Sequence, residues 1–235
     1  MTDDELRTVL ADRVRAVRTR IAAACARADR DPAGVTLVAV TKTVGARVAG
    51  LLPEMGVADL GENRPQTLWA KAAALAGRGI RWHLIGHLQR NKVEQTLPHV
   101  ELIHSIDSLR LLHAVAAAGA KLGRRPRVLL QINASREGQK QGFDYAEVLA
   151  AADEIRAASV EVVGLMGMAA FADDPEATRP TFAELRRFRD HVRGEWGVTL
   201  PELSMGMSGD FEVAVEEGAT LVRVGTTLLS GMNDG

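Results

Sequence analysis

The sequence predicts a closed (β/α)8 barrel, which is a ring of parallel strands enclosed by helices. After Pro32, eight short apolar runs rich in β-branched residues alternate with helical stretches. The runs are apolar along their whole length, which is typical of parallel strands buried on both faces. An open doubly wound sheet commonly has about five or six such units, so eight units favour the closed barrel.

The first thirty residues predict a helix that precedes the barrel. Thr2 and Glu5 have the spacing of a capping box at its start. Cys25 extends the apolar stripe of this helix, which favours a buried small side chain over a reactive thiol. The stripe recurs at steps of three and four residues and consists of Leu6, Val9, Leu10, Val14, Val17, Ile21 and Ala24.

The chain has no Gly/Ser/Pro-rich linker, so we expect a single domain over residues 1–235. The eight strands are expected at residues 35–41, 57–60, 80–85, 100–106, 127–132, 160–165, 203–205 and 220–224. The helices between them are expected at 44–56, 64–77, 88–97, 108–121, 145–157, 176–195 and 210–217, with a short one after Gly225.

Composition and charge exclude several classes of protein. The net charge of −1 provides no electrostatic footprint for nucleic-acid binding, and a single cysteine rules out an internal disulfide and a multi-cysteine metal site. His83 and His87 are poorly suited to a metal, because His83 falls on a strand and no carboxylate ligand is evident. The acidic N-terminus is no signal peptide, and the longest uncharged stretch, 162–172, is shorter than the ~20 residues that span a bilayer. We therefore expect a cytoplasmic protein with no nucleic-acid or membrane partner. We also expect it to be a monomer.

Lys42 is the most informative residue in the sequence. It follows a buried strand directly, and barrels of this type place their sites at the carboxyl ends of the strands. Only five of the 29 basic residues are lysines, and arginine cannot replace an amine that must form a Schiff base. Desolvation at the strand end would lower the pKa of Lys42 and leave its amine nucleophilic. The alternative is an ordinary lysine that extends into solvent.

The loops after the seventh and eighth strands predict a phosphate site. Ser208 precedes one predicted helix, and Gly225 and Thr226 begin the next. Barrels often bind phosphate in these loops, with backbone N–H groups and hydroxyls as donors. Ordinary helix capping by Ser208 or Thr226 is the alternative. A reactive lysine beside a phosphate site indicates pyridoxal phosphate, or the sugar-phosphate substrate of a Schiff-base aldolase.

The other four lysines are weaker candidates for a ligand contact. Lys71 and Lys121 fall on predicted helices and are expected at the surface. Lys92 and Lys140 are expected near the barrel mouth, and a second ligand-contacting lysine at Lys140 is a hypothesis that the Lys140→Ala variant would test.

Six segments in order carry a resemblance to a known family: Val38–Thr43, Gly61–Asn63, Trp82–Lys92, Gly164–Met168, Leu203–Ser208 and Arg223–Thr226. Together they resemble the pyridoxal phosphate homeostasis proteins, and the match covers nearly the whole chain. The resemblance implies a fold-type III barrel similar to the N-terminal domain of alanine racemase.

The resemblance also implies that seven residues bind pyridoxal phosphate. Arg223 would face the pyridine nitrogen, and since guanidinium only donates hydrogen bonds, that nitrogen would stay unprotonated and be a poor electron sink. The other implied roles are a Schiff base with Lys42, phosphate contacts from Ser208, Gly225 and Thr226, and positions beside the ring for Asn63 and His83.

Three functions are open at this point. A non-catalytic carrier would hold pyridoxal phosphate and deliver it to apo-enzymes, and we favour this function. An alanine-racemase-type enzyme would need a tyrosine from a further C-terminal domain, which we do not expect, because the last predicted strand ends near Val224. The only tyrosine, Tyr145, begins a predicted helix. A Schiff-base aldolase would need an acid/base pair deep in the barrel, where the strands offer few candidates.

Overall fold

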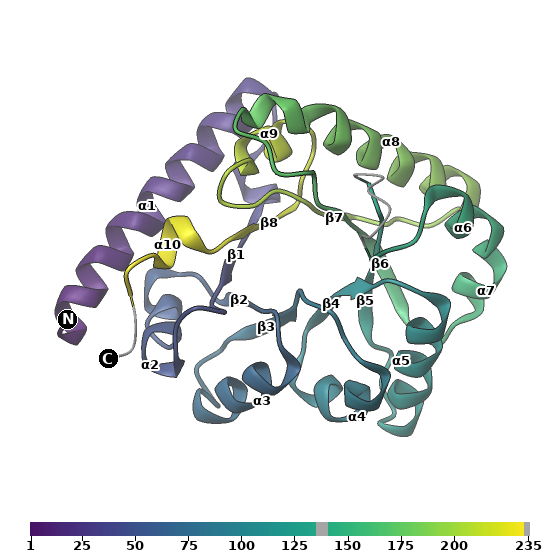
Figure 1. Cartoon of the computed structure of the whole chain (residues 1–235), viewed down its shortest axis with the longest axis horizontal. Helices are drawn as coiled ribbons and strands as arrows, with labels where there is room; N and C mark the ends of the chain where they lie inside the picture. The colour runs from purple at the N-terminus through teal and green to yellow at the C-terminus, as the bar shows by residue number, and fades with distance from the viewer. Residues whose placement is uncertain (135–140, 233–235) are drawn as a thin grey trace.

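The computed structural model describes residues 1–134 and 141–232, and its strands close into the predicted barrel. All eight strands run parallel in chain order, and β1 pairs with β8 to complete the ring (Figure 1). The strands are β1 Thr36–Val40, β2 Asp59–Glu62, β3 Arg81–Leu84, β4 Leu102–Ile106, β5 Arg127–Gln131, β6 Glu161–Met166, β7 Glu202–Ser204 and β8 Leu221–Val224.

The helices enclose this ring, and several are shorter than the sequence predicts. The segment expected at 88–97 is one short α-helix between two 3-10 turns, and the segment expected at 145–157 is divided at Ala151. Pro53 and Pro98 lack an N–H donor and lie in the first turn of 3-10 segments. The helices are α2 Ala46–Ala49, α3 Pro65–Ala74, α4 Val93–Thr96, α5 Leu109–Lys121, α6 Tyr145–Ala150, α7 Ala152–Ala157, α8 Arg179–Trp196, α9 Phe211–Glu216 and α10 Thr226–Leu229.

The predicted leading helix is α1, Asp3–Arg27, and its capping box is confirmed. The Thr2 hydroxyl accepts from the Glu5 N–H, while the Glu5 carboxylate accepts from the Thr2 N–H. The apolar stripe packs α1 against α9 and α10 on the outside of the barrel (Figure 1). Cys25, near the end of α1, is fully buried, as expected.

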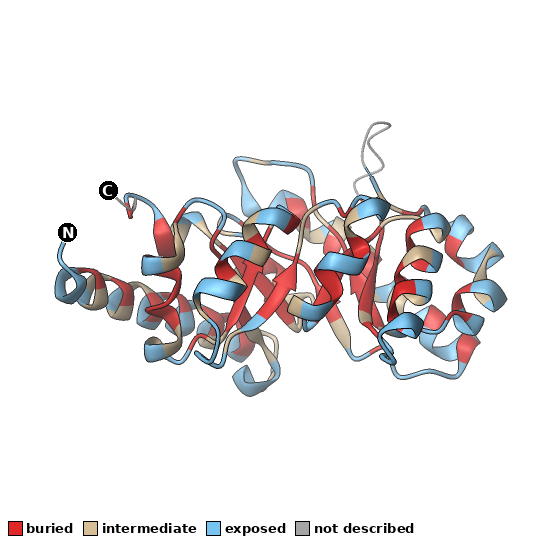
Figure 2. Ribbon diagram, turned by 90° about the horizontal axis from the view of Figure 1, so that it is seen from below, coloured by how far each residue is buried: buried red, intermediate tan, exposed pale blue. Residues whose placement is uncertain are grey.

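The strands separate two apolar regions. The larger one fills the space between the strands and the surrounding helices, and the strands are buried along most of their length (Figure 2). The smaller region fills the inside of the ring with Val38, Leu102, Leu129, Val163, Met166 and Leu221.

No helix in the described part of the chain is long and apolar enough to cross a membrane.

Candidate functional site

A cavity of about 400 Å³ opens at the carboxyl ends of the strands. Its volume lies within the range of ~300–1,000 Å³ that is usual for small-molecule sites. The predicted residues come from the ends of β1, β2 and β8 and from the loop after β7. The cavity brings together six of the seven: Lys42, Asn63, Ser208, Arg223, Gly225 and Thr226.

Lys42 lies in a turn immediately after β1. Thr41 before it is buried and donates its N–H to the carbonyl of Gly61 at 3.0 Å, and the Val44 N–H closes the turn on the Thr41 carbonyl at 3.1 Å. The Lys42 side chain is exposed at the cavity mouth, so the protein around it does not supply the desolvation expected from the sequence. Its amine is instead open to a ligand that enters the cavity.

A buried ion pair supports the turn that carries Lys42. Lys71 of α3, expected at the surface, is 5% exposed and its Nζ pairs with the carboxylate of Glu62. The same Nζ donates to the carbonyl of Thr41 at 2.7 Å, and the Thr41 hydroxyl donates to Glu62 Oε1 at 2.6 Å. The prediction for Lys71 was therefore wrong, because α3 presents this residue to the outward face of β2 rather than to solvent.

The loop between β7 and α9 is shaped by Gly206 and Asp210. Gly206 has φ of 89°, and a Cβ there would meet the Cβ of Ala214 at 2.5 Å. The Asp210 carboxylate accepts from the Met207 N–H at 2.6 Å, which closes the loop around Ser208. Burial raises the pKa of Asp210, although the Met207 N–H and the Arg223 charge oppose this.

Ser208 connects this loop to the start of α10. Its hydroxyl oxygen accepts from the N–H of Gly225 at 3.2 Å and from the N–H of Thr227 at 3.4 Å. Two backbone donors and several hydroxyls therefore converge at one side of the cavity, which is the donor set that an anion such as phosphate requires.

Arg223 is buried at the base of the cavity. Its Nη1 donates to the carbonyl of Ser204 at 2.8 Å and to the Ser204 hydroxyl at 2.5 Å, and its Nη2 donates to the carbonyl of Gly167 at 3.1 Å. Burial lowers the pKa of Arg223 to about 10, and the charge of Asp210 opposes this, so the guanidinium stays positive at neutral pH. Two of its five N–H groups have no partner among the described residues and remain for a ligand.

His83 is the one predicted residue that does not line the cavity. It is buried inside the barrel, where its Nδ1 lies 2.9 Å from His104 Nε2 and its Nε2 lies 3.0 Å from Asp59 Oδ1. The resemblance implies a position beside a bound ring, whereas β3 places His83 one layer below its carboxyl end. The cavity is reached instead by Ile85 and Gly86, which follow β3.

Several cavity residues were not predicted from the sequence. Gln131, the last residue of β5, donates through Nε2 to the carbonyl of Gln141 at 3.0 Å, and a polar residue that ends an apolar strand could have indicated it. His87 also lines the cavity and pairs with Asp107 at 3.1 Å. Met166, Met168 and Met207 form apolar walls without a distinctive sequence signal. Lys140, for which the sequence suggested a ligand contact, lies outside the described residues.

The fold and the site define a (β/α)8 barrel of the alanine racemase N-terminal type. The family model described as "Alanine racemase, N-terminal domain" matches residues 12–232. Similar curated proteins include the pyridoxal phosphate homeostasis proteins of Deinococcus radiodurans, 43% identical, and of Aquifex aeolicus, 39% identical. Each alignment covers 92% of this chain, with 99% and 96% of the respective relative. The chain belongs to the family of pyridoxal phosphate homeostasis proteins.

Solved structures agree with this assignment. PipY from Synechococcus elongatus, determined with pyridoxal phosphate bound, is 34% identical with a TM-score of 0.83 and covers 93% of this chain and 99% of its own. The alanine racemase of Clostridium difficile shares the fold alone, at 18% identity and a TM-score of 0.70, over 92% of this chain and 56% of the racemase.

Proposed function

We propose that this chain binds pyridoxal phosphate in the cavity, attached to Lys42, and acts in intracellular homeostasis and delivery of that cofactor. The observation that carries the proposal is the meeting of Lys42, Arg223 and the Ser208 loop in one cavity. The cofactor supplies an aldehyde that condenses with a primary amine. Lys42 is the lysine that lines this cavity among the described residues.

The residues present fit this cofactor at both of its polar ends. At one side, the N–H groups of Gly225 and Thr227 already point to an oxygen, that of Ser208, and match the acceptors of a phosphate. At the base, the two unpaired N–H groups of Arg223 match a ring nitrogen that accepts. Between them the wall is largely apolar, as a flat aromatic ring requires.

The position of Arg223 favours a protein that binds the cofactor over one that uses it for catalysis. A guanidinium has donors only, so a ring nitrogen that faces it stays unprotonated and withdraws little electron density. Asn63 is half-buried at the cavity wall beside Lys42 and is proposed to contact the ring. His83 is proposed to act through Arg223 rather than by direct contact.

The cavity offers few groups for acid/base catalysis. Among the described residues, its lining includes no tyrosine, aspartate or glutamate. Tyr145, the only tyrosine of the chain, packs in α6 with its ring 4.5 Å from that of Phe188 in α8. These observations support a non-catalytic carrier over a racemase and over a Schiff-base aldolase.

We further propose that the carrier passes its cofactor to apo-enzymes in the cytoplasm and acts as a monomer. The exposure of Lys42 supports transfer, because an incoming amine could reach the cofactor carbon that would be joined to the Lys42 nitrogen.

Absorption spectroscopy of purified protein titrated with pyridoxal phosphate tests the binding. We expect a saturable visible band in the wild type that Lys42→Ala abolishes and Lys92→Ala retains. A protein that gains no band would overturn the proposal. Racemase assays over a panel of amino acids separate the alternatives, since robust turnover would identify an enzyme.

A further inference from the structure

A chain of buried polar residues crosses the inside of the barrel. It begins at Arg223 in the cavity, continues through Ser204 of β7, His104 of β4 and His83 of β3, and ends at Asp59 of β2. The four contacts measure 2.5, 2.9, 2.9 and 3.0 Å in that order. His104 and Ser204 are fully buried, in an interior that is otherwise filled by apolar side chains.

The two ends of the chain determine the direction of its two outermost hydrogen bonds. Arg223 can only donate, so the Ser204 hydroxyl accepts from it. Asp59 is ionised at neutral pH: burial opposes its ionisation, but bonds from His83 and Arg81 hold its pKa at about 2. The carboxylate can therefore only accept, and His83 must donate to it through Nε2.

The middle of the chain follows from its ends. Burial, together with the positive charge of the nearby Arg223, lowers the pKa of His104 well below its ordinary value, so this ring is neutral. Neutral rings with Nε2–H satisfy every contact: Ser204 donates to His104 Nδ1, and His104 Nε2–H donates to His83 Nδ1. If His83 were protonated, its Nδ1–H would donate to His104 Nε2, and His104 would then donate through Nδ1–H to the Ser204 oxygen. That oxygen would accept from both His104 and Arg223, and the hydroxyl proton would lose its acceptor, His104 Nδ1.

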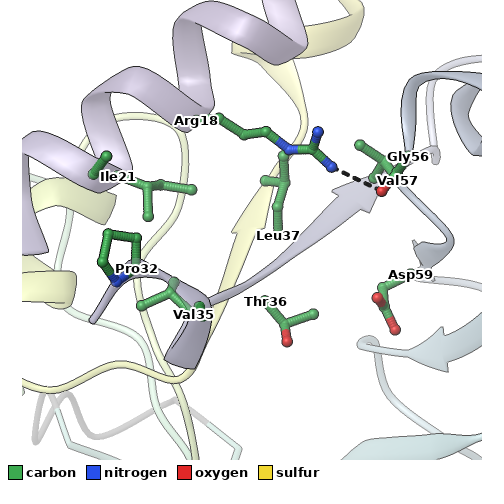
Figure 3. Close-up of a pocket in the computed structure, with 11 residues that line it drawn as sticks. Arg18, Ile21, Pro32, Val35, Thr36, Leu37, Gly56, Val57 and Asp59 are labelled. Carbon is green, nitrogen blue, oxygen red and sulfur yellow. Dashed lines mark hydrogen bonds between the residues drawn. The ribbon is translucent and has the colours of Figure 1, made fainter. Parts of the chain in front are cut away.

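The far end of the chain lies at the opposite end of the barrel. Asp59 begins β2 and borders a second cavity, of about 470 Å³, between α1 and the amino ends of the strands (Figure 3). Arg18 of α1 crosses this cavity and donates to the carbonyl of Gly56 at 2.8 Å. Besides His83, the charged group that pairs with Asp59 is Arg81 on β3, which is largely exposed, and Arg223 is the positive charge that acts on His104.

We propose that Ser204, His104 and His83 are positioning residues that fix the orientation of Arg223 toward the bound cofactor, through one unidirectional hydrogen-bond chain anchored on Asp59. This inference rests on the proposed function. A cation at one end and an anion at the other align all the intervening bonds, and aligned bonds in a buried chain strengthen one another. The chain keeps the Nη1 donors of Arg223 engaged, and the two N–H groups that have no partner among the described residues are left for the ring nitrogen.

Nitrogen-15 NMR of the protein without ligand tests the direction of the chain. At pH 7 we expect neutral rings with Nε2–H for both His83 and His104. A Nδ1–H or doubly protonated His104 would overturn the proposal, whether or not the protein binds pyridoxal phosphate.

Variants at both ends test the effect on the cofactor. Asp59→Asn, at the far end, is expected to mix the histidine tautomers and to weaken pyridoxal phosphate binding about fivefold. Ser204→Ala keeps the backbone carbonyl that Arg223 also uses, and it is expected to weaken pyridoxal phosphate binding to a similar extent. This variant serves as the test if Asp59→Asn does not fold. The matched control is Glu101→Gln, which breaks another ion pair at the amino ends of the strands, in which Glu101 Oε1 lies 2.9 Å from Arg127 Nη1. This variant is expected to change neither the histidine tautomers nor the binding of pyridoxal phosphate.

The two proposals fail differently. Altered tautomers with unchanged binding in Asp59→Asn would overturn the positioning role while the proposed function stands. A wild type that shows both Nε2–H tautomers but binds no pyridoxal phosphate would overturn the proposed function and the positioning role with it.

Discussion

Lys71 and Glu62 form a buried ion pair directly beneath the turn that carries Lys42. Both side chains are almost inaccessible to solvent, and Thr41 contributes a carbonyl and a hydroxyl to the same cluster. A buried pair of this kind contributes to specificity of position more reliably than to net stability. Here it fixes the end of β1 to β2 and α3, and so determines where the Lys42 amine stands.

Replacement of Lys71 by methionine is expected to destabilise the protein by about 3 kcal/mol or more, because it leaves Glu62 buried without a counter-charge. Urea unfolding measures this difference. Lys121→Met is the matched control, since Lys121 pairs with Glu94 at the exposed surface and this pair is expected to contribute less than about 1 kcal/mol. Equal midpoints for the two variants would show that the buried pair is unimportant. Adding Glu62→Gln to Lys71→Met should recover part of the loss.

Asp59 is expected to make stability depend on acid pH. Its folded pKa of about 2 lies below the unfolded value near ~3.9, so the unfolded state binds more protons as the pH falls through this window. The stabilising contribution is complete above about pH 4 and is lost toward pH 2. When the pH is lowered from 5 to 2.5, we expect the free energy of unfolding of Asp59→Asn to fall by about 1.5 kcal/mol less than that of the wild type. Asp12→Asn, in an exposed pair with Arg15, should follow the wild type.

Ser208→Ala is expected to weaken pyridoxal phosphate binding about tenfold, because a hydroxyl that contacts a charged phosphate contributes ~1.5–3 kcal/mol. The same variant should bind pyridoxal, which lacks the phosphate, as the wild type does. Equilibrium titrations with both compounds measure the difference. If Ser208→Ala weakens both ligands equally, the phosphate does not lie against this loop.

Gly206→Ala is expected to reduce stability and cofactor affinity together, since φ of 89° and a 2.5 Å contact with Ala214 leave no space for the added methyl group. Gly194→Ala, within α8, is the control: nothing lies within 4 Å of the added Cβ, and helix propensity predicts about 0.5–1 kcal/mol of stabilisation. Thermal unfolding distinguishes the two. A Gly206→Ala protein that unfolds with the wild type would show that the loop accommodates a side chain.

The sequence predicted the barrel well because buried parallel strands are marked by apolar runs and the helices by their periodicity. Lys42 and the Ser208 and Gly225 loops were found because they directly follow strands, where the barrel topology places a site. The length of each helix was less predictable. Prolines and tertiary contacts divide the stretches at 44–56 and 88–97 into short turns.

The buried polar contacts were beyond the sequence. Lys71 was expected at the surface because nothing in its helix indicates that Glu62 faces it from β2. His104 and Ser204 lie 100 positions apart and meet only because the barrel closes. The family resemblance implied that His83 lies beside the ring, and its position along a strand did not reveal which layer of the barrel the side chain occupies.

Attachment of the cofactor to Lys42 is the central claim, and chemical mapping tests it most directly. The protein is incubated with pyridoxal phosphate, reduced with borohydride to make the attachment permanent, digested and analysed by mass spectrometry. We predict that the reduced adduct lies on the peptide that contains Lys42, and that Lys42→Ala loses it while Lys92→Ala keeps it. An adduct located mainly on Lys92, Lys121 or Lys140, or one that survives unchanged in Lys42→Ala, would contradict the account.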